Sequence, residues 1–135
     1  MTASIAERIH AANTALIVEG DLDRVGEFFA EDYVVHLTEQ NMKGGHDTVK
    51  KVVTMFRSAF SELTCDVEIL VEGSDRVAWQ RTLRGVHSGS FRGFPATGKP
   101  IVWRDMLTSV LDGQRITEEW VVSDLAEQLL AGRKK

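Results

Sequence analysis

Cysteine, positive charge and long apolar runs are all scarce in this chain of 135 residues. The single cysteine, Cys65, excludes an internal disulfide, and the four histidines do not combine with it at zinc-ligand spacing. No apolar run approaches the roughly 20 residues of a membrane-spanning helix, and the N-terminus lacks the pattern of a secretory signal. We therefore expect a cytoplasmic protein with no membrane segment and no structural metal.

The charge balance is mildly acidic, with 20 acidic against 16 basic residues and a net charge of -4. The only run of like charge is residues 133–135 at the tail, which we interpret as a solvated terminus. Such a surface offers no basic field for nucleic acid. A hydrophobic content of 43% and a charged content of 27% are ordinary for a globular protein. We expect a single domain over residues 1–135.

Helical patterns fill most of the N-terminal half. Ser4 followed by Glu7 forms a capping box, and apolar residues then recur at helical spacing until Gly20. A short second helix, capped by Asp21, is predicted to carry Leu22, Val25, Phe28 and Phe29. A strand follows over residues 33–37. A third, amphipathic helix is predicted over residues 46–60, with one apolar stripe of Val49, Val52, Val53, Phe56 and Phe60.

The periodicity changes to two in the C-terminal half, where two hairpins are predicted. Residues 64–73 pair with 76–87, and residues 101–111 pair with 115–123 across the turn "DGQ". A loop rich in glycine and proline joins the hairpins over residues 88–100. Helices followed by long antiparallel strands indicate an α+β fold.

The predicted strand over residues 101–111 is apolar on both faces. Ile101, Trp103, Leu107 and Leu111 lie on one face, and Val102, Met106 and Val110 on the other. Such a strand needs cover on both sides. Because the helices can cover only one side of the sheet, we expect the other side to pair two copies in a homodimer or a higher homo-oligomer built from dimers.

Four segments covering nearly the whole chain resemble the SnoaL-like polyketide cyclase family of the nuclear-transport-factor-2-like superfamily. They are "GDLDRVGEFFAEDYVVH", "GGHDTVKKVVTMFRSAFSEL", "DRVAWQRTLRGVHSGSFRGFPATGKPIVWRD" and "DGQRITEEWVVSDLAEQLL". The resemblance implies a strongly curved antiparallel sheet wrapped around N-terminal helices into a cone with one apolar pocket. The superfamily includes cyclases, isomerases, dehydratases, epoxide hydrolases and binding modules, so the fold does not fix the function.

The resemblance assigns the catalytic role to Asp124, which follows the last predicted strand and matches the acid/base aspartate of the cyclases. On a regular strand it would share a face with Ile116, Trp120 and Val122. The alternative is that Asp124 caps the helical turn that follows it. His36 matches a pocket histidine of the family, and we expect both residues to converge on one cavity. A histidine satisfied by backbone groups is the alternative for His36.

Other candidates would contact the ligand. Trp103 and Trp120 are expected to line the pocket or to fill the core, and Phe60, Glu118, Gln80 and Asp105 are further candidates. Gln80 stands where many relatives carry arginine, and Ser109 stands where the cyclases carry a histidine. Glu118 is alternatively expected to pair across strands with Arg81 or Arg104.

The expected activity is cofactor-independent acid/base catalysis, of a cyclase, isomerase or related lyase, on a polycyclic or otherwise apolar carbonyl compound. The first alternative is a non-catalytic protein that binds a small hydrophobic ligand. A second is an epoxide-hydrolase-like enzyme that uses Arg104, Asp105 and Asp124. Adjacent residues of a strand face opposite ways, so Arg104 and Asp105 could share the pocket only at a bulge. A third is a scaffold whose sheet binds a protein partner.

Overall fold

The computed structural model describes residues 4–38 and 40–133, which form an α+β fold. Most helices precede the sheet strands in sequence, and the chain closes with a helix. The elements are α1 (Ile5–Ala12), a π-helix (Asn13–Val18), a 3-10 turn (Leu22–Arg24), α2 (Val25–Phe28), β1 (Phe29–His36), β2 (Asn41–Met42), α3 (His46–Ala59), β3 (Phe60–Glu72), β4 (Arg76–His87), β5 (Pro100–Asp112), β6 (Arg115–Ser123) and α4 (Leu125–Arg133).

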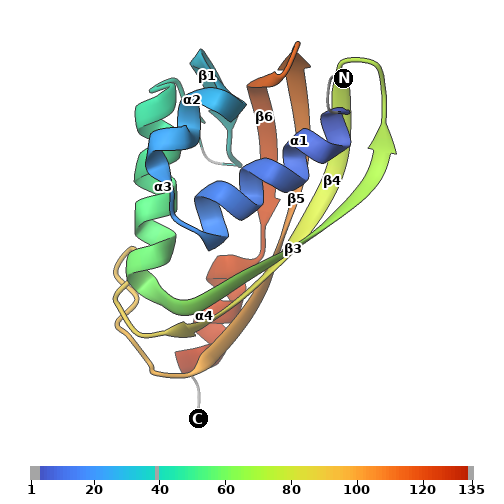
Figure 1. Cartoon of the computed structure of the whole chain (residues 1–135). Helices are drawn as coiled ribbons and strands as arrows, with labels where there is room; N and C mark the ends of the chain where they lie inside the picture. The colour runs from blue at the N-terminus through green and yellow to red at the C-terminus, as the bar shows by residue number, and fades with distance from the viewer. Residues whose placement is uncertain (1–3, 39, 134–135) are drawn as a thin grey trace.

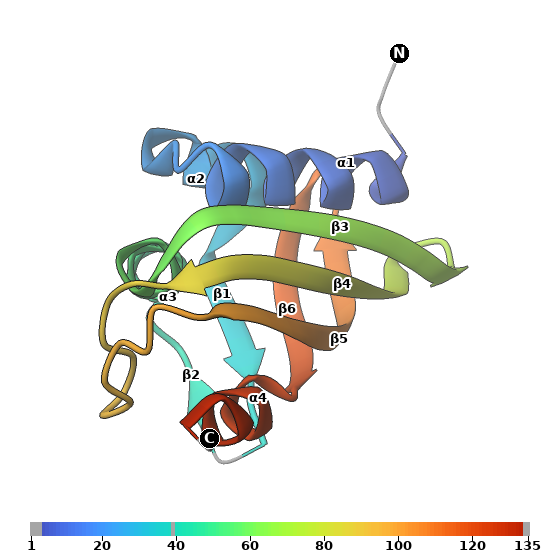
Figure 2. The same ribbon diagram turned by 90° about the horizontal axis from the view of Figure 1, so that it is seen from below.

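One six-stranded sheet runs in the order β2-β1-β6-β5-β4-β3. β1 and β6 pair in parallel, and the other neighbours are antiparallel. The sheet curves, and α1 and α3 lie on its concave side, with α1 beside β3 (Figure 1; Figure 2). The helix α4 packs against β5 at the other end. The predicted curved sheet over N-terminal helices is confirmed.

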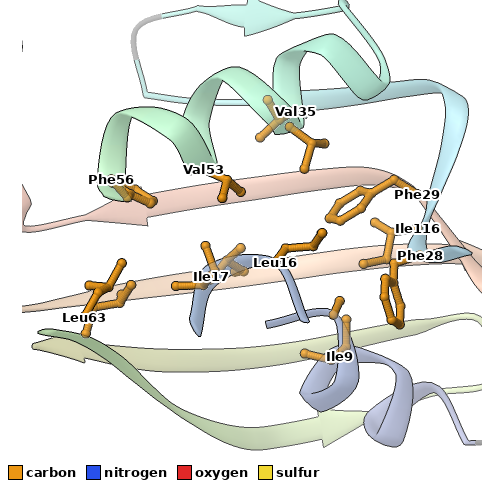
Figure 3. Packing of buried hydrophobic residues seen from close by; sticks show 14 of the residues in the cluster. Ile9, Leu16, Ile17, Phe28, Phe29, Val35, Val53, Phe56, Leu63 and Ile116 are labelled. Atoms are coloured by element: carbon orange, nitrogen blue, oxygen red, sulfur yellow. The ribbon is translucent and has the colours of Figure 1, made fainter. Parts of the chain in front are cut away.

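The core fills the space between the helices and the concave face of the sheet. Leu16 and Ile17 of the π-helix, Val53 of α3 and Ile116 of β6 are all buried there (Figure 3). The π-helix widens the turn after α1, so the first helix is not the regular α-helix that the spacing predicts. Such turns are frequent at functional sites, and this one faces the interior.

A glycine fixes the start of α3 against β1. Gly45 has a φ of 60°, and a Cβ there would lie 2.2 Å from the backbone oxygen of Glu31. Only glycine allows so close an approach in this conformation. The helix is observed over His46–Ala59, close to the prediction, but Phe60 begins β3 instead of ending the helix. Phe29, predicted on the second helix, begins β1.

An extra residue in β6 determines which side chains face inward. Leu111 pairs with Ile116 and Val110 pairs with Glu118, so Thr117 is a β-bulge. After the bulge the alternation reverses: Glu119 is buried, and Trp120 is 42% exposed. The prediction that Ile116, Trp120 and Val122 share one face is therefore wrong, because it assumed an unbroken period of two.

Candidate functional site

A cavity of about 300 Å³ lies between the concave face of the sheet, the π-helix, α3 and α4. Its wall is mostly apolar, with side chains that include Leu16, Val35, Val49, Val53, Phe56, Leu107 and Val121. A few polar side chains interrupt this wall, among them Asn13, Tyr33, Arg81, Asp105 and Glu119. An apolar wall with a few polar groups is typical of small-molecule sites.

Arg81 and Asp105 form an ion pair on the cavity wall. They are directly opposite each other on β4 and β5, and both point to the concave side. Nε of Arg81 donates to Oδ2 of Asp105 at 2.9 Å, and its Nη1 donates to Oδ1 of Asn13 at 2.9 Å. The side chains of Arg81 and Asp105 are 13% and 3% exposed. The pair is thus largely removed from solvent.

The two ends of this pair differ in their remaining hydrogen-bonding capacity. Burial alone would lower the pKa of Arg81, but the Asp105 carboxylate and other negative groups outweigh it and leave that pKa raised. Oδ1 of Asp105 is buried, and no residue in the described part of the chain bonds to it. A buried acceptor without a partner is costly, so this oxygen is a candidate contact for a ligand.

A second polar cluster lines the same cavity around Glu119. Its Oε1 accepts a hydrogen bond from the Tyr33 hydroxyl at 2.6 Å, and its Oε2 accepts one from Ser109 Oγ at 2.5 Å. The indole Nε1 of Trp79 donates to the same Ser109 Oγ at 2.9 Å. Ser109 and Glu119 are opposite each other on β5 and β6, which explains why this cluster forms once the bulge turns Glu119 inward.

Burial sets the proton affinities in this second cluster. Desolvation raises the pKa of Glu119, and the hydrogen bonds from Ser109 and Tyr33 and the charge of Arg81 offset it only in part. Burial also raises the pKa of Tyr33 well above its usual value, and the neighbouring Glu119 raises it further. A carboxyl group whose pKa is raised toward neutrality is suited to donate as well as accept protons.

Asp124 does not line the cavity. Its Oδ1 accepts a hydrogen bond from the backbone N–H of Arg104 at 2.7 Å, and its Oδ2 accepts one from Nε2 of Gln128 at 3.2 Å. Asp124 directly precedes α4, and its carboxylate joins Gln128 of that helix to the backbone of β5, so its observed contacts are structural but are not the backbone cap of the alternative. The prediction that Asp124 and His36 converge on one cavity is wrong.

His36 lies on the opposite, convex face of the sheet. Its Nε2 is 2.5 Å from Oε2 of Glu118, its Nδ1 is 2.6 Å from Oδ1 of Asn41, and its ring stacks on Trp120 at 4.8 Å. The hydrogen bond to Glu118, followed by that to Asn41, raises the pKa of His36. Glu118 thus pairs with His36 instead of Arg81 or Arg104. All three predicted site residues here, His36, Trp120 and Glu118, face away from the cavity because of the Thr117 bulge and the alternation of β1.

The remaining predicted ligand contacts divide between the convex face, the core and the cavity. Gln80 is on the convex face and donates from Nε2 to Oε1 of Glu68 at 2.6 Å. Trp103 and Phe60 are buried, but their rings pack on each other, with 4.6 Å between ring centres, and they do not line the cavity. Asp105 is the predicted contact that does line it. Arg104 faces outward beside it, so the trio of Arg104, Asp105 and Asp124 that the epoxide-hydrolase-like alternative requires does not assemble.

The sequence reasoning missed several functional candidates: Asn13, Tyr33, Arg81 and Glu119. Arg81 follows Trp79 by two residues and so shares its face, which was a usable signal. Glu119 gave no such signal, because only the bulge brings it inward. In the described ranges 4–38 and 40–133, no group of three or more His, Cys, Asp or Glu side chains is arranged to hold a metal, and no helix is long and apolar enough to cross a membrane.

Comparison with known proteins identifies the family. The model of the SnoaL-like polyketide cyclase family matches residues 7–131. The chain belongs to this family. No curated protein matches the chain at a significant level.

Solved structures of SnoaL-like proteins share the fold. A candidate polyketide cyclase from Acidithiobacillus ferrooxidans superimposes with a TM-score of 0.82 at 23% identity over 98% of both chains, a likeness that establishes the fold alone. IdmH, a candidate polyketide cyclase from Streptomyces antibioticus, has a TM-score of 0.80 at 29% identity, over 96% of this chain and 98% of its own. AclR, a candidate hydroxylase from Streptomyces galilaeus, has a TM-score of 0.78 at 26% identity, over 96% of this chain and 82% of its own.

Proposed function

We propose that this SnoaL-like protein is a cofactor-independent acid/base enzyme of the cyclase type, acting on a small apolar carbonyl compound in the cavity. The observation that carries the proposal is the buried pair of Arg81 and Asp105 on a mostly apolar wall, with one carboxylate oxygen that no group in the described ranges contacts by a hydrogen bond. The family and the likeness to IdmH and AclR favour a cyclase- or hydroxylase-type role. At about 300 Å³, the cavity is at the small end of ligand pockets and suits a bicyclic compound better than a larger one.

The chemistry is an intramolecular aldol closure. Oδ1 of Asp105 takes a proton from the carbon beside a carbonyl group, and the C–H electron pair moves into an enolate whose oxygen is stabilised by the positive Arg81. The enolate carbon attacks a second carbonyl carbon of the same molecule, so a C–C bond forms and that carbonyl oxygen becomes an alkoxide. The alkoxide takes the proton back from Asp105, which returns the carboxylate to its starting state.

The apolar wall supports this chemistry in two ways. It excludes water, which would otherwise screen the attraction between Arg81 and the enolate oxygen. It also holds a flat hydrocarbon frame by contact alone, so that the few polar groups determine the orientation of the ligand.

Proton exchange on 2-tetralone, a bicyclic apolar ketone, tests the first half of the reaction without knowledge of the natural substrate. In D2O the wild-type protein should accelerate exchange of the protons beside the carbonyl, as followed by NMR. Asp105→Asn should remove this acceleration, because an amide cannot take the proton. Asp124→Asn tests the residue that the family resemblance assigns as the base, and we expect this variant to accelerate proton exchange as the wild type does.

Two further results would redirect the proposal. Binding of 2-tetralone without accelerated exchange by the wild-type protein would refute catalysis and favour a ligand-binding protein. Hydrolysis of styrene oxide that depends on Asp105 would favour the epoxide-hydrolase-like alternative, which the Asp105–Arg81–Asn13 cluster also suits. If Asp105→Asn does not fold, Asp105→Glu can replace it, because it keeps the charge but moves the carboxylate oxygen. This variant should accelerate proton exchange on 2-tetralone less than the wild type does.

A further inference from the structure

We propose that Tyr33 and Glu119 form a second anchoring point in the cavity, where the Tyr33 hydroxyl donates a hydrogen bond to a carbonyl oxygen at the end of the ligand away from Asp105. Glu119 is the positioning residue: as a neutral carboxylic acid it donates to Tyr33 and frees the tyrosine hydrogen for the ligand. This inference rests on the proposed function, because it names a second feature of the same substrate. The substrate class becomes a compact apolar compound with oxygen functions at both ends.

The hydrogen-bond directions around Glu119 determine where its proton can be. The indole N–H of Trp79 can only donate, so the oxygen of Ser109 accepts from it and the Ser109 hydrogen is directed to Oε2 of Glu119. Oε2 is therefore an acceptor. A proton on Glu119 that keeps the hydrogen bond from Ser109 is on Oε1, which faces the Tyr33 oxygen at 2.6 Å. In that state the Tyr33 oxygen accepts, and its own hydrogen can turn toward the cavity that the side chain lines.

The balance of charge favours the neutral form of Glu119. Arg81 is directly bonded to Asp105, and one guanidinium cannot neutralise two buried carboxylates. Glu119 is 5% exposed and has no direct cationic partner among the residues that the structure describes. Burial is also the main cause that raises its pKa. Neutralisation is the usual response of an unpaired buried acid.

The two polar clusters are separated along one strand. Asp105 and Ser109 are four residues apart on β5, so their Cα atoms are about 13 Å apart at the usual rise per residue. The side chains bring the clusters closer than these Cα atoms, because Cζ of Arg81 lies 5.6 Å from the centre of the Trp79 ring and its charge acts on Tyr33 and Glu119. A compact ligand that fills the cavity can therefore reach both clusters, with a different polar atom at each. This spacing is the reason for assigning two oxygen functions to the substrate instead of one.

A matched pair of ligands tests the second anchoring point: 2-tetralone carrying an acetyl group at its position 6, and the same compound carrying an isopropenyl group there. They differ only in that the acetyl oxygen is replaced by a CH2 group, and both retain the ketone expected at Arg81 and Asp105. Calorimetry should show that the wild type binds the acetyl compound about three- to tenfold more tightly, as expected for one hydrogen bond. In Tyr33→Phe the two affinities should become equal.

The role of Glu119 has a separate readout in the pH dependence. Glu119→Gln imitates the neutral acid, because its amide nitrogen can donate to Tyr33 while its oxygen accepts from Ser109. The variant should keep the preference for the acetyl compound. In the wild type the preference should fall as pH rises through the pKa of Glu119, since the ionised carboxylate takes back the tyrosine hydrogen. In Glu119→Gln the preference for the acetyl compound should not fall with pH, because the amide does not ionise. Glu118→Gln, on the convex face, is the matched control and should follow the wild type.

The outcomes separate this inference from the proposed function. Equal binding of both ligands by the wild type, or a preference that persists in Tyr33→Phe, would overturn the inference and leave the chemistry at Asp105 intact. Failure to bind either ligand would count against the proposed function as well. Tyr33 is the only tyrosine of the chain, so a single 13C label on its ring carbon should report the contact directly. An unchanged signal on binding of the acetyl compound would also overturn the inference.

Discussion

Arg81 on β4 and Asp105 on β5 face each other at 2.9 Å on the wall of the cavity, with both side chains largely out of solvent. Each charge depends on the other, because neither is in water that could stabilise it alone. The same arrangement that supports a catalytic role therefore carries a cost in stability when one partner is removed.

The first prediction concerns this pair. Asp105→Leu should lower the free energy of unfolding by about 3–5 kcal/mol, because it leaves the Arg81 charge buried without a counterion. The double variant Arg81→Met/Asp105→Leu should be more stable than Asp105→Leu alone, since no buried charge remains. Urea unfolding of the wild type, both single variants and the double variant measures the coupling. Additive losses would contradict the prediction and show that the two charges do not depend on each other.

The second prediction concerns the pH dependence that Glu119 contributes to stability. The folded-state pKa of Glu119 is raised by burial, so below about pH 4 both the folded and the unfolded chain hold the proton and nothing is lost. As pH rises, Glu119 loses its proton in the unfolded chain before it does so in the folded chain, which favours unfolding. This loss of stability stops growing once pH exceeds the folded-state pKa of Glu119. The wild type should thus lose stability over this window relative to Glu119→Gln.

Urea unfolding of the two proteins at a series of pH values measures that difference. The advantage of Glu119→Gln should grow with pH and then level off. Glu72→Gln removes an exposed carboxylate at the end of β3, away from His36, and should not show this growth. A difference between Glu119→Gln and the wild type that stays constant with pH would mean that folding does not raise the pKa of Glu119, and it would contradict the prediction.

The third prediction concerns the single thiol. Burial raises the pKa of Cys65 to about 11, and its Sγ lies 3.7 Å from Oδ1 of Asn13, which also binds Arg81. Because the thiolate is the reactive form, alkylation by iodoacetamide near neutral pH should be roughly a hundredfold or more slower than for a free cysteine. The urea-unfolded chain is the control and should react at the ordinary rate. Equally fast reaction of the folded protein would show that the thiol is not shielded.

Much of the fold could be predicted because local signals agree with the tertiary structure. The capping box of Ser4 and Glu7 forms as predicted, and the apolar stripe of residues 46–60 gives α3. The burial of alternate residues in 101–111 also follows the pattern: Trp103 is 1% exposed, whereas Met106 is 50% exposed. In these segments the periodicity alone determines which face is inside.

The residues of the site could not be predicted as well, because one extra residue in β6 changes which of its side chains face the cavity. The sequence of β6 offers an apolar set that includes Trp120 and a polar set that includes Glu119, and hydrophobicity favours the first as the inner face. The bulge at Thr117 puts Glu119 inside, where Tyr33 and Ser109 satisfy both of its oxygens. Tyr33 comes from β1, 86 residues away, and Ser109 faces Glu119 across the β5–β6 hairpin only because of the bulge, so no pattern within β6 itself reveals them. The same reversal moves Glu118 to the outside, whereas His36 is there because it alternates with the buried Tyr33 and Val35 on β1.

The fourth prediction concerns the convex face, where exposed apolar side chains gather on two neighbouring strands. Val102 and Met106 of β5 are 47% and 50% exposed, and Trp120 and Val122 of β6 are 42% and 65% exposed. Met106 and Val122 are directly paired across the strands, so these side chains form one patch. Monomeric proteins rarely leave such a patch in water.

We therefore expect two copies to pair through this face about a twofold axis, which buries the same patch of each copy. The total interface should exceed about 1,000 Å², as specific contacts do. Sedimentation at micromolar concentration should show a dimer for the wild type, and Met106→Glu should shift it toward the 15.0 kDa monomer by placing a charge in the patch of each copy. Leu130→Glu on α4 alters a side chain of the same 50% exposure outside the patch, and it should remain dimeric. A wild-type species of one chain's mass, with no heavier form, would contradict the prediction and leave the apolar patch without a function.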